Sequence, residues 1–386
     1  MISCQIVFIN ETKGYKKCDK KKVCYKIKSL SKVSKLRFRL KNNKMNPIAG
    51  IVLIALGSIG AASFYVPFKK VNSWAWESYW ISQGLFAWII IPWLFALIFV
   101  PHGELIPIIR DSPSSAKLMA IFFGILWGFG GLTFGLSLRY LGVALGQSIA
   151  LGLCAAFGTL LPPIIAGNNL FATTGGVLTV IGVAITIAGI IIIGYAGSLK
   201  STEMSEEEKR AAVKEFALKK GLVIAIFAGI MSACFNFGFE SGKPIETVAL
   251  AHGTNPLFQK NPSLIFILLG GFITNLAYCA FLNIKNKTYK DYYTVPGKVL
   301  FNNLLLTFLA GLLWFLQFHF FGMGSSKLPP SMAVFGWSIL MALNIAISNI
   351  WGILLHEWKG AKRKTILVLM TGIVVLILST FIVKLG

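Results

Sequence analysis

The chain has 386 residues, of which 55% are hydrophobic and only 13% are charged, and its mean hydropathy is +0.72. Soluble domains average about 25% charged residues, so this composition excludes a single soluble domain, a disordered chain, a disulfide scaffold and an ordinary nucleic-acid binder. At about 20 apolar residues per membrane crossing, the chain has room for about ten transmembrane helices. We therefore expect an all-α polytopic protein of the lipid bilayer.

Residues 1–44 differ from the rest of the chain, because they hold 14 Lys and Arg against 2 Asp and Glu, or +12 of the net charge of +23. Their one short apolar stretch follows no basic segment, which argues against a signal peptide. Cys18 and Cys24 have no neighbouring histidine to complete a zinc site. We interpret 1–44 as a basic, disordered leader, with Met45 as the expected true start. A basic arm on anionic lipid is the alternative.

Apolar runs then follow one another along the chain, separated by proline, glycine and charged punctuation. The ten predicted spans are 47–67, 76–100, 116–138, 141–165, 173–196, 221–240, 263–284, 299–324, 330–355 and 364–385. The longest charged segment lies in 197–220, and we expect it to be a linker with a short surface helix. It divides the chain into two halves of five spans, 45–196 and 221–386.

The two halves contain similar segments. GILWGFGGLTFG (124–135) in the third span matches GLLWFLQFHFFG (311–322) in the eighth, with Gly124 and Trp127 aligned to Gly311 and Trp314. A weaker match joins the first and sixth spans. Because each half has an odd number of spans, the second half must cross the membrane inverted. Two inverted five-helix repeats with a site between them near the midplane are typical of secondary transporters.

Cationic loops indicate the orientation of the halves. Loops after odd-numbered spans carry 17 Lys and Arg, whereas the opposite side from Met45 onward carries 6. By the positive-inside rule, Met45 and the C-terminus lie outside. The basic leader argues for the reverse, so the sequence leaves the orientation open.

Few ionisable groups lie at membrane depth, where such groups usually face a cavity or a partner. Glu77, His319 and Glu240 are the candidates for a proton-coupling group. Each has a structural alternative: Glu77 pairs with Lys69 or Lys70, Glu240 pairs with Lys243 at the end of the sixth span, and His319 packs as a hydrogen-bonded side chain. Glutamate and histidine are both able to bind a proton that a gradient delivers.

Sugar recognition needs aromatic faces together with amide, hydroxyl and charged groups. The candidates for sugar contact are Trp127, Trp314, Gln317, Arg139, Asn236, Gln147 and Asn344. Lys69, Lys70 and Trp76 are candidates for a loop or gate. The sequence has no ATP-binding loop and no motif of a catalytic or metal site, so we expect no enzyme activity, no metal and no cofactor. A proton gradient, or a sodium gradient, remains as the energy source.

Several strings resemble the L-rhamnose–proton symporter family of the drug/metabolite transporter superfamily. They are ASFYVPFKKVNSWAWESYW, LRYLGVALGQSIALG, LKKGLVIAIFAGIMSA, LLWFLQFHFFGMG and LHEW. The resemblance covers nearly all of 45–386. It implies ten helices in two inverted repeats and proton-coupled uptake of a 6-deoxyhexose. Residues on the matching strings are Lys69, Lys70, Trp76, Glu77, Arg139, Trp314 and Gln317. His319 and Glu240 depart from the family pattern, which marks either local variation or a changed substrate or coupling ion.

We therefore expect a proton-coupled importer of L-rhamnose or a related 6-deoxyhexose in the cell inner membrane, working by alternating access. One alternative is a drug or metabolite exporter, or a symporter of another sugar driven by H⁺ or Na⁺. A membrane enzyme or structural membrane protein is the second alternative. The expected partners are a small sugar and lipid, without nucleic acid, and the sequence leaves the oligomeric state open.

Overall fold

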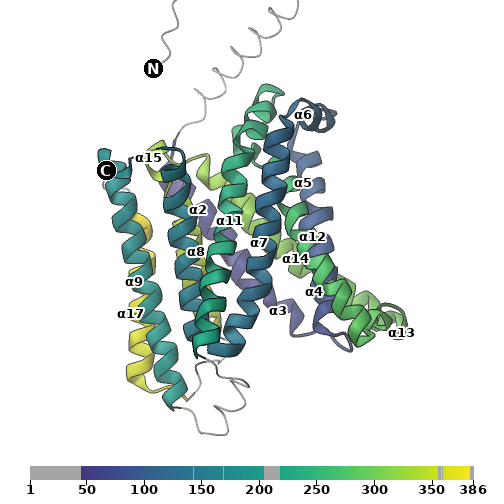
Figure 1. Cartoon of the computed structure of the whole chain (residues 1–386), viewed down its shortest axis with the longest axis vertical. Coiled ribbons are helices and arrows are strands. Elements are labelled where there is room, and N and C mark those ends of the chain that lie inside the picture. Colours follow the sequence, from purple (N-terminus) through teal and green to yellow (C-terminus); the bar gives the residue numbers. More distant parts are fainter. Residues whose placement is uncertain are drawn as a thin grey trace, which may run out of the picture.

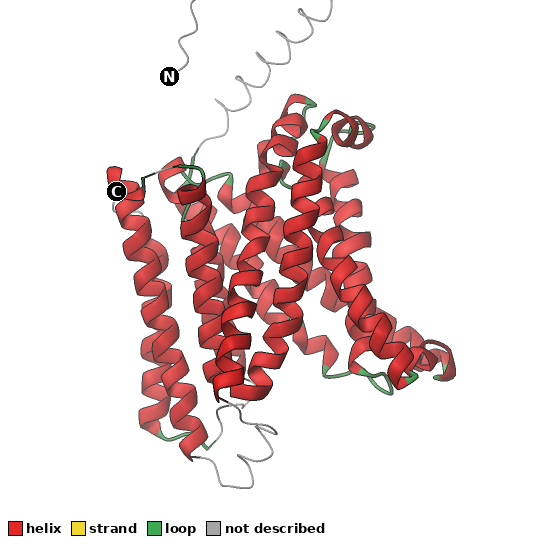
Figure 2. Ribbon diagram, in the orientation of Figure 1, coloured by secondary structure: helices red, strands yellow, loops and turns green. Residues whose placement is uncertain are grey.

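The computed structural model describes residues 45–141, 143–167, 169–203, 218–354, 358 and 360–382. The predicted leader and the predicted surface helix of the linker lie outside this part. The described residues fold into helices joined by short loops, without a strand among them (Figure 2). An all-helical membrane protein is the architecture that the composition predicts, because helices satisfy every backbone polar group internally in lipid.

The helices follow closely the apolar runs of the sequence. In chain order they are α2 (Pro47–Ser63), α3 (Tyr65–Phe68), α4 (Trp76–Gly84), η1 (Leu85–Ile90), α5 (Ile91–Phe99), α6 (Leu105–Asp111), α7 (Ser114–Leu141), α8 (Val143–Ile165), η2 (Leu170–Ala172), α9 (Thr174–Glu203), α11 (Leu218–Ala251), η3 (Pro256–Phe258), α12 (Asn261–Asn286), η4 (Thr288–Lys290), α13 (Asp291–Thr294), α14 (Gly297–Ser325), α15 (Pro330–Ala333), α16 (Gly336–Leu354) and α17 (Arg363–Ile382).

Eight helical stretches of the described part are long and apolar enough to cross a membrane. The expected fourth and ninth spans correspond to two shorter apolar helices, Ile149–Ile165 and Gly336–Trp351. The predicted end of the sixth span at residue 240 was wrong, because α11 continues through Pro244 to Ala251. Proline removes one backbone donor, and here the helix tolerates it and gains three further turns. Those turns carry Glu246 into the interior.

The helices pack in a bundle in which sequence-distant helices lie side by side (Figure 1). α7 packs on α11 and α12, while α14 packs on α2 and on the segment from α4 to α5. α9 packs on α17. A Cβ on Gly124 of α7 would collide with the carbonyl oxygen of Ile267 in α12, and a Cβ on Gly270 of α12 would collide with that of Ile121. Glycine at both positions lets the two backbones approach, as small residues do in membrane interfaces.

The second predicted span contains a π-helical segment, η1, between α4 and α5. Its hydrogen-bond register is wider than that of an α-helix: the Ile91 N–H bonds to the carbonyl of Phe86. Pro92 follows directly and has no N–H to donate to the carbonyl of Trp88, which would be its acceptor in an α-helix. π-Helical turns in membrane helices often occur at functional sites, and this one presents Trp88 to the centre of the bundle.

The two ends of the bundle differ. α6 and α15 lie at one end, together with the last turn of α17, whereas α3 and α13 lie at the other (Figure 1). The start of α2 also lies at the α15 end, since the Asn46 N–H donates to the carbonyl of Lys327 after α14 (2.9 Å). We call the first end the α15 end and the second the α13 end.

Candidate functional site

A cavity of about 400 Å³ enters the bundle at the α15 end. Its walls come from both predicted halves: α8 from the first, and α11, the two residues before α12, α14, α15 and α16 from the second. The described lining residues that carry polar or charged groups are Thr159, Asn236, Glu240, Lys243, Glu246, Gln259, Lys260, Ser325 and Ser326. A polar cavity of this size among apolar helices accommodates a small hydrophilic molecule.

Two ion pairs lie on the cavity wall. Glu246 of α11 and Lys260, which directly precedes α12, form an enclosed pair with an N–O distance of 3.0 Å. Their side chains are only 9% and 13% exposed. Glu240 and Lys243 form a second pair one turn apart on α11, and both side chains are largely exposed at the cavity mouth. This second pair is the structural alternative that the sequence offered for Glu240.

Aromatic rings form the apolar part of the cavity. Phe239, Phe321 and Trp337 line it. The Lys260 ammonium lies 5.0 Å from the centre of the Phe239 ring, a cation–π distance. Beneath these rings Phe235 and Phe318 stack with their centroids 3.9 Å apart. Stacked aromatic rings therefore separate the cavity from the middle of the bundle.

The middle of the bundle holds the two tryptophans that the internal repeat aligns. Trp127 and Trp314 lie 5.5 Å apart between ring centroids, and Trp88 packs edge-on against both. Gln317, one turn after Trp314, is buried, and its amide donates to the Trp314 carbonyl (3.0 Å). Asn344 of α16 donates to the Gln317 side chain (3.4 Å). The structure thus brings together Trp127, Trp314, Gln317 and Asn344.

Four buried polar atoms near this centre have no partner among the described residues: both amide atoms of Gln83, the indole nitrogen of Trp88 and the side-chain oxygen of Asn344. The Gln83 side chain is fully buried in α4, and Trp88 is 2% exposed in η1. An unpaired amide in a low-dielectric interior is costly, so such groups often mark a place where a ligand or water binds. Sequence reasoning overlooked Gln83 and Trp88, although a glutamine within an apolar run was a signal that could have found Gln83.

Asn236 lines the cavity, and its amide donates to the Gly158 carbonyl of α8 (2.6 Å). It thus ties the two predicted halves together at the cavity. The side chains of the remaining two candidates for sugar contact, Arg139 and Gln147, lie outside the described part of the structure.

Glu77 lies at the α13 end, far along the helices from the cavity. Its carboxylate accepts hydrogen bonds from Asn286 (2.9 Å) and Thr288 (2.8 Å). Next to it, Ser78 donates to Asp291 (2.7 Å). These bonds join the start of α4 to the loop after α12, so Glu77 has partners other than the lysines that the sequence suggested.

The remaining gate candidates surround this junction. Lys69 and Lys70 are exposed after α3. Trp76 is 39% exposed and stacks on Trp80 with ring centroids 5.4 Å apart. Trp80 in turn donates to Asn275 of α12 (3.0 Å). The sequence string that contains these residues therefore forms one connected surface.

His319 is buried in α14 within a cage of phenyl rings. Phe95, Phe99 and Phe258 lie within 4.9 to 5.7 Å of it between ring centroids. Its Nδ1 lies 3.1 Å from the side-chain oxygen of Asn261. His319 is not among the residues that line the cavity, and its surroundings match the packing role that the sequence offered as an alternative.

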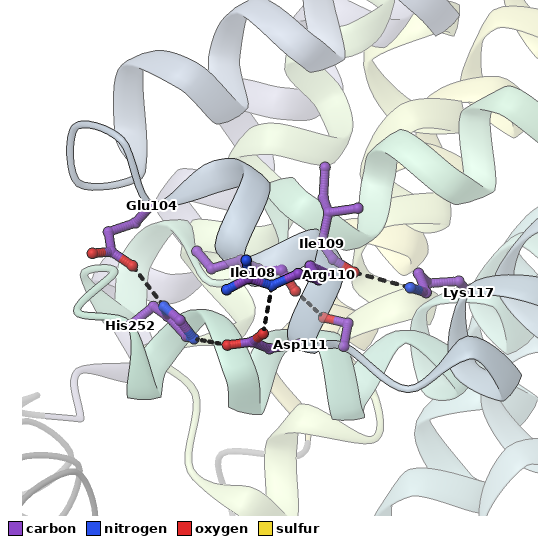
Figure 3. A network of polar contacts seen from close by, with 8 residues as sticks. Glu104, Ile108, Ile109, Arg110, Asp111, Lys117 and His252 are labelled. Carbon is purple, nitrogen blue, oxygen red and sulfur yellow. Dashed lines mark hydrogen bonds and ion pairs between the residues drawn. The ribbon is translucent and has the colours of Figure 1, made fainter. Parts of the chain in front are cut away.

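A second charged cluster lies at the α15 end, outside the cavity (Figure 3). His252, directly after α11, faces Glu104 with Nδ1 (2.6 Å) and Asp111 with Nε2 (3.0 Å). Arg110 also bonds to Asp111 (3.2 Å), and this bond, together with His252, holds the pKa of the Asp111 carboxyl below its usual range. The cluster fastens α6 of the first half to α11 of the second.

Glu246 and Lys260 also escaped the sequence analysis. The reason is physical: Pro244 reads as a helix breaker, so residues beyond Glu240 were assigned to a loop, where charges are ordinary. Lys260 stands before a proline at the start of the seventh run and reads as a loop cation for the same reason. Only the packing of α11 against α12 brings the two charges together inside the bundle.

Comparison with known proteins identifies the family of this chain. The sequence matches the L-rhamnose-proton symport protein family (RhaT) over residues 42–386. It is 39% identical over 344 residues to the L-rhamnose-proton symporter of Yersinia pestis (strain Pestoides F), covering 88% of this chain and 98% of that protein. The same figures hold for the L-rhamnose-proton symporter of Yersinia pseudotuberculosis serotype O:1b (strain IP 31758).

The family is one of transporters and not of enzymes, and the many apolar helices make this chain a multi-pass membrane protein. A match over most of the chain, by both the family and the relatives, settles the assignment. The chain is a member of the L-rhamnose-proton symport protein family.

Proposed function

We propose that this protein imports L-rhamnose together with a proton across the cell inner membrane. The observation that carries the proposal is the polar and aromatic cavity at the α15 end of a chain from the rhamnose symporter family. A 6-deoxyhexose has one apolar edge, including its methyl group, which suits Phe239, Phe321 and Trp337. Its hydroxyls suit Asn236 and the neighbouring charges.

We infer alternating access between two inverted five-helix repeats, with α8 and α16 as the fourth and ninth of ten crossings. The packing of the helices supports this. α7 packs on α11 and α12, and their counterparts under the repeat, α14 on α2 and the α4–α5 segment, pack likewise. The aligned glycines behave alike: Gly124 lies against α12, and Gly311 lies against Gln83 and Phe86 of the equivalent segment.

The α15 end is the outer face in this proposal. The cation-rich loops after odd-numbered spans belong to the α13 end, which the positive-inside rule assigns to the cytoplasm. The cavity then opens outward, and the stacked rings of Phe235 and Phe318 close it from below. This outward-open arrangement is the one expected of an importer before it binds its substrate.

In the course of transport, the sugar passes from the outer cavity to the central tryptophans. Trp127, Trp314, Gln317 and Asn344 are proposed as its contacts at the midplane, with Asn236 at the entrance. Gln83 and Trp88 supply unpaired polar atoms that sugar hydroxyls could satisfy. Glu77, His319 and Glu240 remain the sequence candidates for the coupled proton.

Sugar-dependent proton uptake tests the function. The full-length chain is reconstituted in liposomes, and external pH is followed on addition of L-rhamnose, L-fucose, D-glucose or a hydrophobic cation. Alkalinisation with L-rhamnose alone is the expected result. Sugar uptake that requires Na⁺ would show that Na⁺ and not H⁺ is the coupling ion. Proton movement with the hydrophobic cation alone would favour an exporter.

A further inference from the structure

We propose that Glu246, paired with Lys260, is the site at which the coupling proton binds. The inference deepens the proposed symport function and rests on it. Neither residue was a candidate from the sequence, and both lie on the wall of the cavity that we assign to the sugar. Proton and sugar would therefore meet in one place.

The location of Glu246 suits a proton that arrives from outside. The Glu246 side chain is only 9% exposed, yet the residue lines a cavity that reaches the α15 end. Water in the cavity can bring a proton to it. Glu77 and His319 lack such a route in this arrangement, because Glu77 lies at the opposite end and His319 lies within phenyl rings.

The ion pair of Glu246 and Lys260 is separate from the other charged residues around it, because those residues have partners of their own. The other charged residues on the described cavity wall, Glu240 and Lys243, are paired with each other. α8, α14, α15 and α16 contribute no charged residue to the described wall. Two further carboxylates at the α15 end, Glu104 directly before α6 and Asp111 of α6, contact His252 and do not line the cavity. Lys260 is thus the counter-ion of Glu246 on the described wall.

The Glu246–Lys260 pair contacts helices that would have to move during alternating access. The Lys260 ammonium lies over Phe239 of α11. A Cβ at Gly322 of α14 would contact the Lys260 side chain at 3.2 Å, so the lysine stem lies against α14. Phe239 and Phe321, whose rings are 5.4 Å apart, continue from it along the wall. Protonation of Glu246 would therefore alter the surroundings of the aromatic rings that are proposed to contact the sugar.

The four loading states of the cavity differ in the way a symporter requires. In the empty carrier the pair is neutral and its charges are satisfied, so the cavity can close. With a proton alone, Glu246 is neutral and Lys260 loses its counter-ion, and closing the cavity over an unpaired ammonium is unfavourable. With sugar alone, the sugar hydroxyls have to compete with Lys260 for the Glu246 carboxylate, because the ion pair is intact. Closing the cavity over the sugar is then unfavourable as well.

With both ligands present, the protonated carboxyl donates to the sugar and the Lys260 ammonium donates to sugar oxygens. The sugar oxygens then solvate the ammonium in place of the carboxylate, every polar group has a hydrogen-bond partner, and the cavity can close with one sugar and one proton. Only the empty and the fully loaded carrier change sides readily, which is the condition for coupling. The proton enters on a Glu246 oxygen and leaves from the same atom when the cavity opens to the other side.

The experiment uses the full chain in proteoliposomes and separates coupling from sugar passage. Uphill accumulation of labelled L-rhamnose is measured under an imposed proton gradient, and counterflow exchange is measured at equal pH, where no net proton movement is needed. For one proton per sugar, a gradient of about one pH unit supports about tenfold accumulation. Glu246→Gln should abolish this accumulation and retain counterflow. Glu104→Gln, the same change at a carboxylate outside the cavity, should retain both.

A binding measurement on the purified chain gives a second readout. L-rhamnose affinity, followed by tryptophan fluorescence, should depend on pH in the wild type and become independent of pH in Glu246→Gln. If Glu246→Gln fails to fold, Glu246→Asp takes its place, and it should accumulate sugar with a shifted pH midpoint. Accumulation by Glu246→Gln, a wild-type pH dependence in that variant, or an unshifted midpoint in Glu246→Asp would each overturn the assignment.

The two proposals fail differently. A wild type that moves no protons with L-rhamnose refutes the proposed function. A wild type that does so, with a Glu246→Gln variant that accumulates sugar equally, refutes only the role of Glu246.

Discussion

The indole rings of Trp127 and Trp314 lie 5.5 Å apart, tilted by 36°, although they come from α7 and α14 on opposite sides of the central linker. They are the residues that the sequence aligned in its two similar segments. Trp88 closes the group by packing edge-on against both rings. Matching positions of the two similar segments therefore meet at the centre of the bundle, which is where the proposed inverted repeat would place a binding site.

This meeting predicts that both tryptophans contribute to sugar affinity. Trp127→Phe and Trp314→Phe keep an aromatic face and should raise the KM for L-rhamnose by no more than about threefold, whereas the alanine variants should raise it by about tenfold. An aromatic contact is worth about 0.5–1.5 kcal/mol, and about 1.4 kcal/mol corresponds to a factor of ten. Initial rates of labelled uptake measure this. If all four variants have the same KM as the wild type, the tryptophans do not contact the sugar.

Glu77→Gln separates the sequence candidate for the proton from the one proposed above. Asn286 and Thr288 donate to a single oxygen of Glu77, and glutamine offers one as well, so the variant should fold. We expect it to keep proton-driven accumulation. Glu77→Ala removes that acceptor and should destabilise the protein by about 1–3 kcal/mol. Loss of accumulation with intact exchange in Glu77→Gln would return the coupling role to Glu77.

Cysteine accessibility tests the orientation of the cavity. In a background without native cysteines, Ala333→Cys on the exposed part of the cavity wall should react with a membrane-impermeant thiol reagent in intact cells. L-rhamnose should slow the reaction. Tyr293→Cys, at the exposed α13 end, should react only after permeabilisation. The opposite pattern would place the cavity on the cytoplasmic face.

Close approach of α7 and α12 should make Gly124 intolerant of a side chain. Gly124→Ala adds a methyl group against the Ile267 carbonyl, and a rigid backbone contact of this kind costs about 1–3 kcal/mol. Gly131→Ala on the same helix is the matched control, since nothing lies within 4 Å of its added Cβ. Alanine is also the better helix former by up to about 1 kcal/mol. Thermal unfolding in detergent should rank Gly131→Ala at or above the wild type and Gly124→Ala below it.

The cluster around His252 should respond to acid through Asp111. The pKa of this carboxyl is held below its usual range by Arg110 and His252. A lowered pKa in the folded state means that the stabilisation is present above the ordinary value of about 3.9 and is lost as pH falls through the folded value. Asp111→Asn should therefore lower Tm slightly at neutral pH, on the order of 1 °C for an exposed pair. The difference should shrink as pH falls below about 3.9 and vanish once the Asp111 carboxyl is protonated, and a constant difference at all pH values would contradict it.

The sequence by itself determined that this chain is a bundle of membrane helices, because apolar runs of about 20 residues have no other stable state in lipid. It also located nearly every helix and aligned Trp127 with Trp314, since span order and residue identity are local properties. Glu77, Glu240 and His319 were found in the same way, as charges or titratable groups within or beside apolar runs. None of this depended on which helix touches which.

Only the tertiary structure decided which polar groups share a cavity. Helix α11 continues through Pro244, and that continuation places Glu246 beside Lys260 across a loop. The same packing surrounds His319 with phenyl rings and places Glu77 within hydrogen-bond distance of the loop after α12. A side chain's environment in a bundle is set by the helices opposite it, and the order of residues along the chain does not state which helices those are.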